Sequence, residues 1–160
     1  MVSTQRGRLG NAVGTAVLDG VQGTGEITIP LDARSLSTGS DLMEKLLRGS
    51  SWFAVEQFPV ITFSASSTSF VDQKPVRIEG ALTLRDLTRP VSLSVTYYAC
   101  TRLPFGLRLT CGMDAQGMIR RSDFGMDSLL TFVGDEVKLL IQAEAVRQES
   151  ATTSTTELRL

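Results

Sequence analysis

The chain contains no histidine, and this absence removes both the commonest general base and the commonest metal ligand. Its two cysteines, Cys100 and Cys111, do not form a Cys-x-x-Cys pair, and two thiols without histidine make a poor zinc site. Ser122 stands beside Asp123, but no base is present to activate its hydroxyl. We therefore predict no catalytic residue, no metal site and no cofactor, and we expect that the protein is not an enzyme.

Long apolar runs and an excess of basic charge are also missing. No segment reaches the roughly 18 apolar residues of a membrane-spanning helix, and the net charge is -1. These two observations argue against stable membrane insertion and against nucleic acid as a partner. The first ten residues are polar and lack the apolar region of a signal peptide, which taken alone favours a cytoplasmic protein.

What the chain does have is alternation of apolar and polar residues in short segments. Val91, Leu93, Val95 and Tyr97 alternate with serine and threonine, for example, and Pro104-Phe105-Gly106 provides a turn after this segment. A period of two with closely spaced turns is typical of an all-β fold, either a sandwich or a barrel. With 160 residues, of which 42% are apolar, the chain fits a single domain.

One short helix is expected among the early strands, over residues 42–48. Asp41 would cap its first turn, Glu44 would reach back to the cap, and Gly49 would end it. Its apolar stripe would consist of Leu42, Met43, Leu46 and Leu47. The last residues, 148–160, are polar and of low complexity, so we expect a flexible tail after a β domain over residues 1–147.

Four segments carry a resemblance to a known family. They are S-T-Q-R-G-R at 3–8 with L-D at 18–19, S-L-S-T-G at 35–39 followed by W-F at 52–53 and F-P-V-I-T-F at 58–63, G-A-L-T-L-R-D-L-T-R-P-V at 80–91, and I-R-R-S-D-F-G-M at 119–126 with D-E-V at 135–137. In this order they resemble the YceI-like polyisoprenoid-binding family. The resemblance implies a lipocalin-like antiparallel β-barrel whose interior binds an isoprenoid-type lipid, such as a polyprenyl phosphate or a quinone, in the periplasm of bacteria.

The chain departs from the family pattern at its start. The family carries a further strand and a signal peptide before the S-T-x-R-G segment, whereas this sequence begins within the pattern. We therefore expect an upstream strand and signal peptide in the gene product. A barrel without that strand would have two open edges, and we expect such a chain to form a homodimer through them.

The residues expected to contact a lipid follow from the alternation. They are Ile29, Phe63, Leu82, Leu84, Val95, Tyr97, Ile119, Phe124 and Met126, with Trp52, Phe53 and Phe58 closing one end. Burial of each methylene of a lipid contributes about 0.8 kcal/mol, so binding needs neither charge nor metal. The alternative is a structural or stress-related interaction module in which the same residues fill a solid core and no ligand binds.

Four arginines flank two corners of the resemblance: Arg85, Arg89, Arg120 and Arg121. If they meet near one mouth of the barrel, they could hold a phosphate or a quinone oxygen, with Arg121 as the first candidate. The alternative is that they pair with neighbouring carboxylates, namely Asp86, Asp123, Asp127 and Glu136.

Cys100 and Cys111 lie at equal distances from the turn between Phe105 and Gly106, so a symmetric hairpin would place them opposite each other. The alternation conflicts with that pairing, because Cys100 falls on the face opposite to Val95 and Tyr97. A bulge near the turn would resolve the conflict. We therefore predict a bulged hairpin closed by a Cys100–Cys111 disulfide in an oxidising compartment. The alternative is two buried thiols in a cytoplasmic protein.

Overall fold

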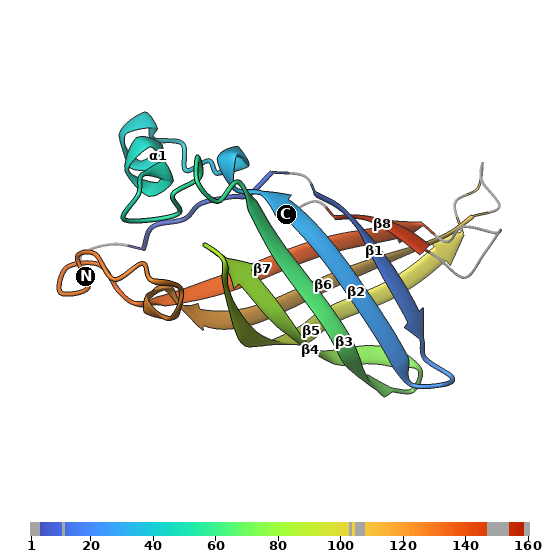
Figure 1. The fold of residues 1–160 in the computed structure, drawn as a ribbon. Coiled ribbons are helices and arrows are strands. Elements are labelled where there is room, and N and C mark those ends of the chain that lie inside the picture. Colours follow the sequence, from blue (N-terminus) through green and yellow to red (C-terminus); the bar gives the residue numbers. More distant parts are fainter. Residues whose placement is uncertain (1–3, 11, 103, 105–107, 147–153, 159–160) are drawn as a thin grey trace.

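The computed structural model describes residues 4–158 except 11, 103, 105–107 and 147–153. Seven antiparallel strands follow one another in chain order and curl into a half-barrel (Figure 1). They are β1 Ala12–Asp19, β2 Thr24–Asp32, β3 Val60–Val71, β4 Lys74–Leu84, β5 Leu87–Arg102, β6 Leu109–Arg120 and β7 Glu136–Val146. The all-β antiparallel fold with one short helix after β2 is as predicted.

An eighth strand closes the barrel. β8, Ser154–Leu158, pairs with Ala12–Ala16 of β1 and with Glu144–Val146 of β7. This differs from the expected flexible tail, of which residues 148–153 and 159–160 lie outside the described part. The threonine-rich segment favours an extended backbone, and the edges of β1 and β7 offer it hydrogen-bond partners.

The alternation seen in the sequence becomes an inner and an outer face. In β2, every second residue is buried, including Ile27, Ile29 and Leu31, while the residues between them are exposed. β3 opposes β2 with Phe63 paired to Ile29, and β4 continues the same face with Leu82 paired to Phe63. The inner faces of β2, β3 and β4 thus form a continuous buried part of the core.

Helix α1 spans Asp41–Arg48, one residue longer than predicted at its start, and its cap differs from the prediction. Ser40 has an extended backbone and its hydroxyl accepts from Met43 N, so Ser40 rather than Asp41 is the N-cap. Glu44 Oε1 does reach back, accepting from Thr38 N at 2.8 Å and Gly39 N at 3.2 Å. No residue of α1 is buried: of the expected apolar stripe, Leu42 and Leu46 are exposed, and Met43 and Leu47 are partly exposed.

Three connections meet at one end of the barrel, here called the capped end (Figure 1). They are residues 33–59 with the 3-10 helix η1 (Ala33–Ser35), the β4–β5 turn at Arg85 and Asp86, and residues 121–135 with η2 (Arg121–Phe124). Arg85 links all three connections, because its guanidinium donates to Gly125 O at 2.6 Å and to Ser50 O at 3.2 Å.

Among the described residues, no helix is long and apolar enough to cross a bilayer.

Candidate ligand-binding site

The inner face of β6 and β7 is set by their register. Ala115 is buried and pairs with Ile141, so Ile141 lies on the inner face, and Leu139 and Ala143 share that face at two-residue spacing. Met113 pairs with Ala143 and extends the same surface along β6. This half of the barrel therefore presents an inner surface that is entirely apolar at these positions.

The two halves of the barrel differ in how fully their inner side chains are covered. Ile29, Phe63 and Ile78 in β2–β4 are 8%, 7% and 0% exposed. On β5–β7 the inner residues Val91, Leu93 and Ala115 are buried as well, but six others contact the core and stay partly exposed: Val95, Met113, Ile119, Leu139, Ile141 and Ala143. On the side away from β6, β7 is paired in the described residues only at Glu144–Val146. Leu139, Ile141 and Ala143 of β7 thus present apolar surface that is only partly covered.

Apart from Tyr97 and Arg121, the residues predicted to contact a ligand fall into two groups. Buried on the inner face or at the capped end are Ile29, Phe63, Leu82, Leu84, Phe124, Met126 and Trp52. Partly exposed are Val95, Ile119, Phe53 and Phe58, of which the first three contact the core. The structure therefore places Val95 and Ile119 in the partly exposed part of the inner face, whereas the buried group lies within the packed core.

Tyr97 is the exception, because its side chain is 57% exposed on the outer face. The register of β5 and β6 shifts between Val95 and Tyr97, which pair with the consecutive residues Ala115 and Asp114. Thr96 is therefore an extra residue in β5, and every later residue changes face. The half-buried Tyr98 takes the inner position, which simple alternation from Val95 assigns to Tyr97.

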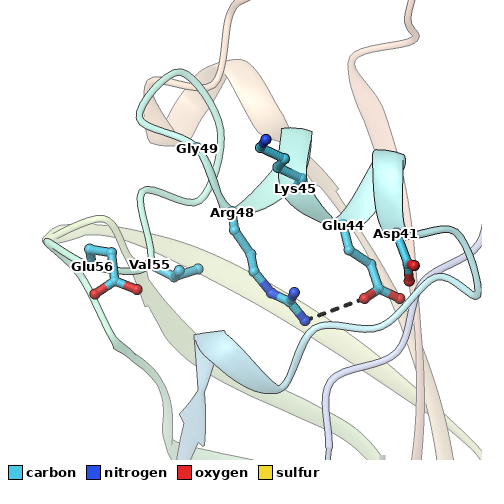
Figure 2. A pocket seen from close by; sticks show the side chains of 7 residues that line it. All are labelled: Asp41, Glu44, Lys45, Arg48, Gly49, Val55 and Glu56. Carbon is cyan, nitrogen blue, oxygen red and sulfur yellow. Dashed lines mark hydrogen bonds and ion pairs between the residues drawn. The ribbon is translucent and has the colours of Figure 1, made fainter.

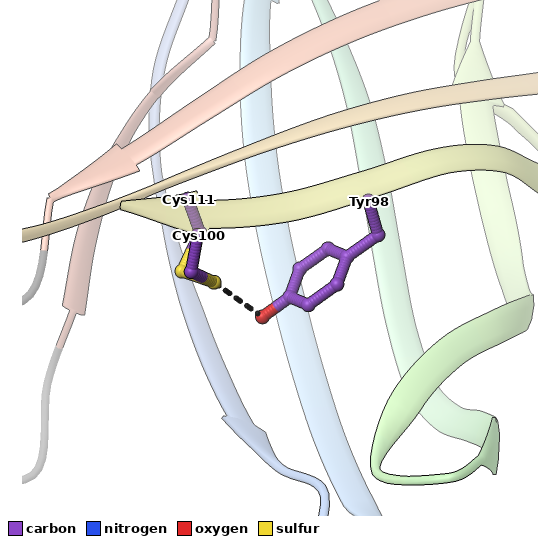
Figure 3. Close-up of a disulfide and its surroundings, with 3 residues drawn as sticks. All are labelled: Tyr98, Cys100 and Cys111. Atoms are coloured by element: carbon purple, nitrogen blue, oxygen red, sulfur yellow. Dashed lines mark hydrogen bonds between the residues drawn. A yellow bond between two sulfur atoms is a disulfide. The ribbon is translucent and has the colours of Figure 1, made fainter. Parts of the chain in front are cut away.

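The predicted disulfide is present, and β5 does contain a bulge, but the bulge lies at Thr96 and not near the turn as predicted. Cys100 and Cys111 are directly paired across β5 and β6, with 4.0 Å between their Cα atoms, and they are joined by a disulfide. The Tyr98 hydroxyl lies 3.2 Å from Cys100 Sγ and donates to it (Figure 3). Burial raises the pKa of this hydroxyl above its ordinary value. The bridge closes the hairpin whose turn, at Pro104-Phe105-Gly106, lies largely outside the described residues.

Replacing both cysteines by serine is expected to lower the free energy of unfolding by about 2.8 kcal/mol, the chain-entropy value for a loop of this length. The two residues are separated by 11 positions, and without the bridge the unfolded chain regains the conformational entropy that closure of this loop removes. Urea unfolding of the oxidised protein and the double variant measures the difference. Equal midpoints and slopes for the two proteins would contradict a stabilising role for the bridge.

Arg121 is only 3% exposed and serves the capped end rather than an open mouth. Its Nε donates to Gly134 O at 2.9 Å, Nη1 to Met126 O at 2.6 Å and Ser128 O at 2.7 Å, and Nη2 to Val133 O at 2.8 Å. The guanidinium also lies 4.8 Å from the ring centre of Trp52. With its donors directed at backbone carbonyls, the group holds the β6–β7 connection in place.

Ser122 and Asp135 fasten the same connection. The Ser122 hydroxyl donates to Asp135 Oδ2 at 2.7 Å, and its backbone N–H donates to Oδ1 at 2.9 Å. These hydrogen bonds, with the charges of Arg121 and Arg120, hold the pKa of the Asp135 carboxyl below its usual value. Arg121 and Ser122 of the Arg-Ser-Asp string thus have a structural role here.

The Asp135 contacts predict loss of stability in acid. A carboxyl with a lowered pKa in the folded state contributes its full stability above the unfolded value of about 3.9, and that contribution disappears as pH falls through the folded pKa. Asp135→Asn should therefore lose less stability than the wild type between pH 5 and pH 3, as measured by thermal unfolding. Asp127→Asn, a change at an exposed carboxyl, should follow the wild-type curve; identical curves for all three proteins would refute the role of Asp135.

A depression of about 400 Å³ lies beside α1 (Figure 2). Charged residues dominate its wall: Asp41, Glu44, Lys45, Arg48 and Glu56. Arg48 donates to Leu36 O at 2.6 Å and contacts Glu44 at 3.5 Å, so it links α1 to the preceding segment. This open, charged depression does not suit an apolar ligand.

The fold is that of a small antiparallel β-barrel with an apolar inner face. A sequence model of the YceI-like domain matches residues 1–145, so the chain belongs to the YceI-like family. The resemblance seen in the four sequence segments is thereby confirmed.

Curated relatives agree with this assignment. A UPF0312 protein of Enterobacter sp. strain 638 is 31% identical over 125 residues, and protein YceI of Salmonella arizonae is 29% identical over 124 residues. Each alignment covers 78% of this chain and 64% of the relative. The chain thus matches somewhat less than two thirds of the length of these relatives.

Solved structures show the same fold. The YceI protein of Campylobacter jejuni superposes with a TM-score of 0.79 at 19% identity, covering 93% of this chain and 88% of that one. BcnA of Burkholderia cenocepacia gives a TM-score of 0.64 at 17% identity, covering 98% and 84%. A domain of Saccharophagus degradans described as polyisoprenoid-binding gives a TM-score of 0.46 at 13% identity, which is too low to carry a functional argument.

Proposed function

We propose that this protein binds the apolar chain of an isoprenoid-type lipid on the inner face of β5–β7 and carries it without catalysing a reaction. The observation that carries the proposal is the partial exposure of inner side chains such as Leu139 and Ile141, which contact the core yet are not covered by it. An apolar surface of this kind is stabilised when an apolar ligand replaces the water on it.

The energy of such binding is sufficient without polar contacts. An isoprene unit has five carbons, and at about 0.8 kcal/mol per buried carbon a single covered unit contributes about 4 kcal/mol. Two or three units on the inner face would exceed a typical association cost. A long, thin, branched chain also suits a curved surface lined by leucine, isoleucine and valine side chains.

We infer that the protein works outside the cytoplasm, in the bacterial periplasm. The Cys100–Cys111 bridge supports this inference, because disulfides persist in oxidising compartments and are rare among cytosolic proteins.

Mass spectrometry of an organic extract of the purified protein tests the proposal directly. We expect a co-purifying isoprenoid lipid, or uptake of a short-chain isoprenoid quinone added to extracted protein, at one molecule per chain. Protein denatured before the addition serves as the control for non-specific adsorption. The absence of both the co-purifying lipid and the uptake would overturn the proposal and favour a barrel that acts only as an interaction module.

A further inference from the structure

The β6–β7 connection carries a run of exposed apolar side chains. Its residues 129–133, here called the apolar tip, are Leu129, Leu130, Thr131, Phe132 and Val133, and all five are exposed. The most exposed is the aromatic Phe132, at 75%. Figure 1 shows this connection, in orange, extending beyond the ends of β6 and β7 at the capped end. Single apolar residues are normal on a protein surface, but contiguous ones mark a contact with a protein or a membrane.

The backbone of the apolar tip is held in a defined shape. Phe132 N and Val133 N both donate to Leu129 O, at 2.9 and 2.8 Å, and close a tight turn. Leu129 has a φ of 57°, in the left-handed region that bulky residues rarely adopt. The guanidinium of Arg121 accepts no such freedom at the base of the tip, because it donates to carbonyls on both sides of it, at Ser128 and Val133. These contacts keep the apolar side chains outside the core and include a strained residue, a feature common at functional sites.

The apolar tip is continuous with the inner face of β7. This strand begins at Glu136, and Val137, the first of its inner residues, is 37% exposed. Leu139 and Ile141 follow at two-residue spacing, and both are partly exposed. Incompletely covered apolar side chains thus run from the tip along the strand on which we propose that the lipid chain lies.

The size of the apolar tip favours a bilayer over a protein as its partner. A stable protein interface uses about 20–30 residues on each side, whereas the tip offers four apolar side chains on one projecting turn. Insertion into a lipid surface needs no complementary partner surface, because each apolar side chain contributes by leaving water.

The charges around the apolar tip determine which lipid surface suits it. Residues 122–137 contain no lysine or arginine but four carboxylates, those of Asp123, Asp127, Asp135 and Glu136. Attraction to a bilayer would therefore come from the apolar side chains alone, and anionic head groups would not strengthen it.

We propose that the apolar tip is a membrane-docking site, whose side chains of Leu129, Leu130, Phe132 and Val133 enter the interfacial layer of a bilayer. Docking there brings the exposed start of β7 to the lipid surface, from which a lipid can pass to the inner face or return. Contact through a few side chains is weak and reversible, as a carrier that must leave the membrane requires. The inference rests on the proposed function for the nature of the cargo, but docking itself is measured without cargo.

Flotation with vesicles of phosphatidylcholine tests the docking site. The wild type should float with the vesicles, and the double variant Leu130→Ser/Phe132→Ser should bind them at least about tenfold more weakly, because two large apolar side chains no longer leave water. Vesicles of phosphatidylglycerol should bind the wild type no more tightly. Both replaced side chains are exposed, so the thermal midpoint should stay that of the wild type.

Val21→Ser is the matched control, since Val21 is 81% exposed in the β1–β2 turn, at the opposite end of the barrel. It should bind vesicles as the wild type does. The docking site is wrong if the wild type does not float, if the double variant floats equally well, or if binding requires phosphatidylglycerol. A wild type that elutes as a dimer in size-exclusion chromatography, with a monomeric double variant, would make the tip a subunit interface and overturn the proposal.

Uptake of a short-chain isoprenoid quinone from solution, without vesicles, separates docking from lipid binding. The wild type and the double variant should take up the quinone equally. Uptake by neither protein would overturn the proposed function and leave docking to the flotation result. A loss in the double variant alone would place the tip within the lipid site and contradict a separate docking role.

Discussion

Replacing Arg121 by alanine is expected to lower the free energy of unfolding by about 4 kcal/mol, because hydrogen bonds to a charged donor are worth about 1.5–3 kcal/mol each and their loss leaves buried acceptors unpaired. Four carbonyl oxygens would lose their donor in this variant, those of Met126, Ser128, Val133 and Gly134. The contact with Trp52 would be lost as well. Urea unfolding followed by tryptophan fluorescence measures the effect, since Trp52 is the single tryptophan.

Two further variants separate the geometry of Arg121 from its charge. Arg121→Lys keeps the positive charge but replaces the planar fork by a point charge, so it should recover only a small part of the lost stability. Arg120→Ala removes a neighbouring, exposed arginine and should change stability by less than about 0.5 kcal/mol. An Arg121→Ala variant as stable as Arg120→Ala would show that the carbonyl contacts do not stabilise the fold.

The strands and the disulfide could be predicted because their signals are local. The alternation in β2 and β4 gives the inner face directly, and the symmetric spacing of Cys100 and Cys111 gives their pairing. The conflict between these two patterns even required a bulge. The prediction placed the bulge near the turn, but an extra residue anywhere between Val95 and Cys100 satisfies both patterns equally well. The structure places it at Thr96, and Tyr97 consequently faces outward.

The capped end was harder to predict, because its contacts join distant segments through the backbone. Arg121 binds carbonyl oxygens, and every residue has one, so no residue type in the sequence marks its partners. The amphipathic pattern of α1 likewise predicts that one face of the helix is apolar, but it does not predict which segment covers that face. In the structure Leu42, which belongs to that face, is 81% exposed. The pairing of β5 with β6 ends at Leu93 and Gly117, and the alternation within each strand does not encode where two strands stop pairing.

Filling the inner face should abolish lipid binding without unfolding the barrel. Ile141 lies beside the uncovered surface of β7 and is partly exposed, so Ile141→Trp would place a larger side chain where we propose the lipid chain lies. If the tryptophan displaces one isoprene unit, the binding free energy falls by about 4 kcal/mol because that unit is no longer buried. This corresponds to about a thousand-fold weaker binding. Titration of the variant with geranylgeraniol measures this loss.

Leu140→Trp is the matched control for this experiment, because Leu140 is the next residue of β7, points to the outer face and is 70% exposed. It introduces the same side chain one position away and should bind geranylgeraniol as the wild type does. Thermal unfolding of both variants shows whether the barrel is intact. Equal affinities for the folded Ile141→Trp and Leu140→Trp variants would place the lipid elsewhere, because the inner and outer faces of β7 would then be equivalent for binding.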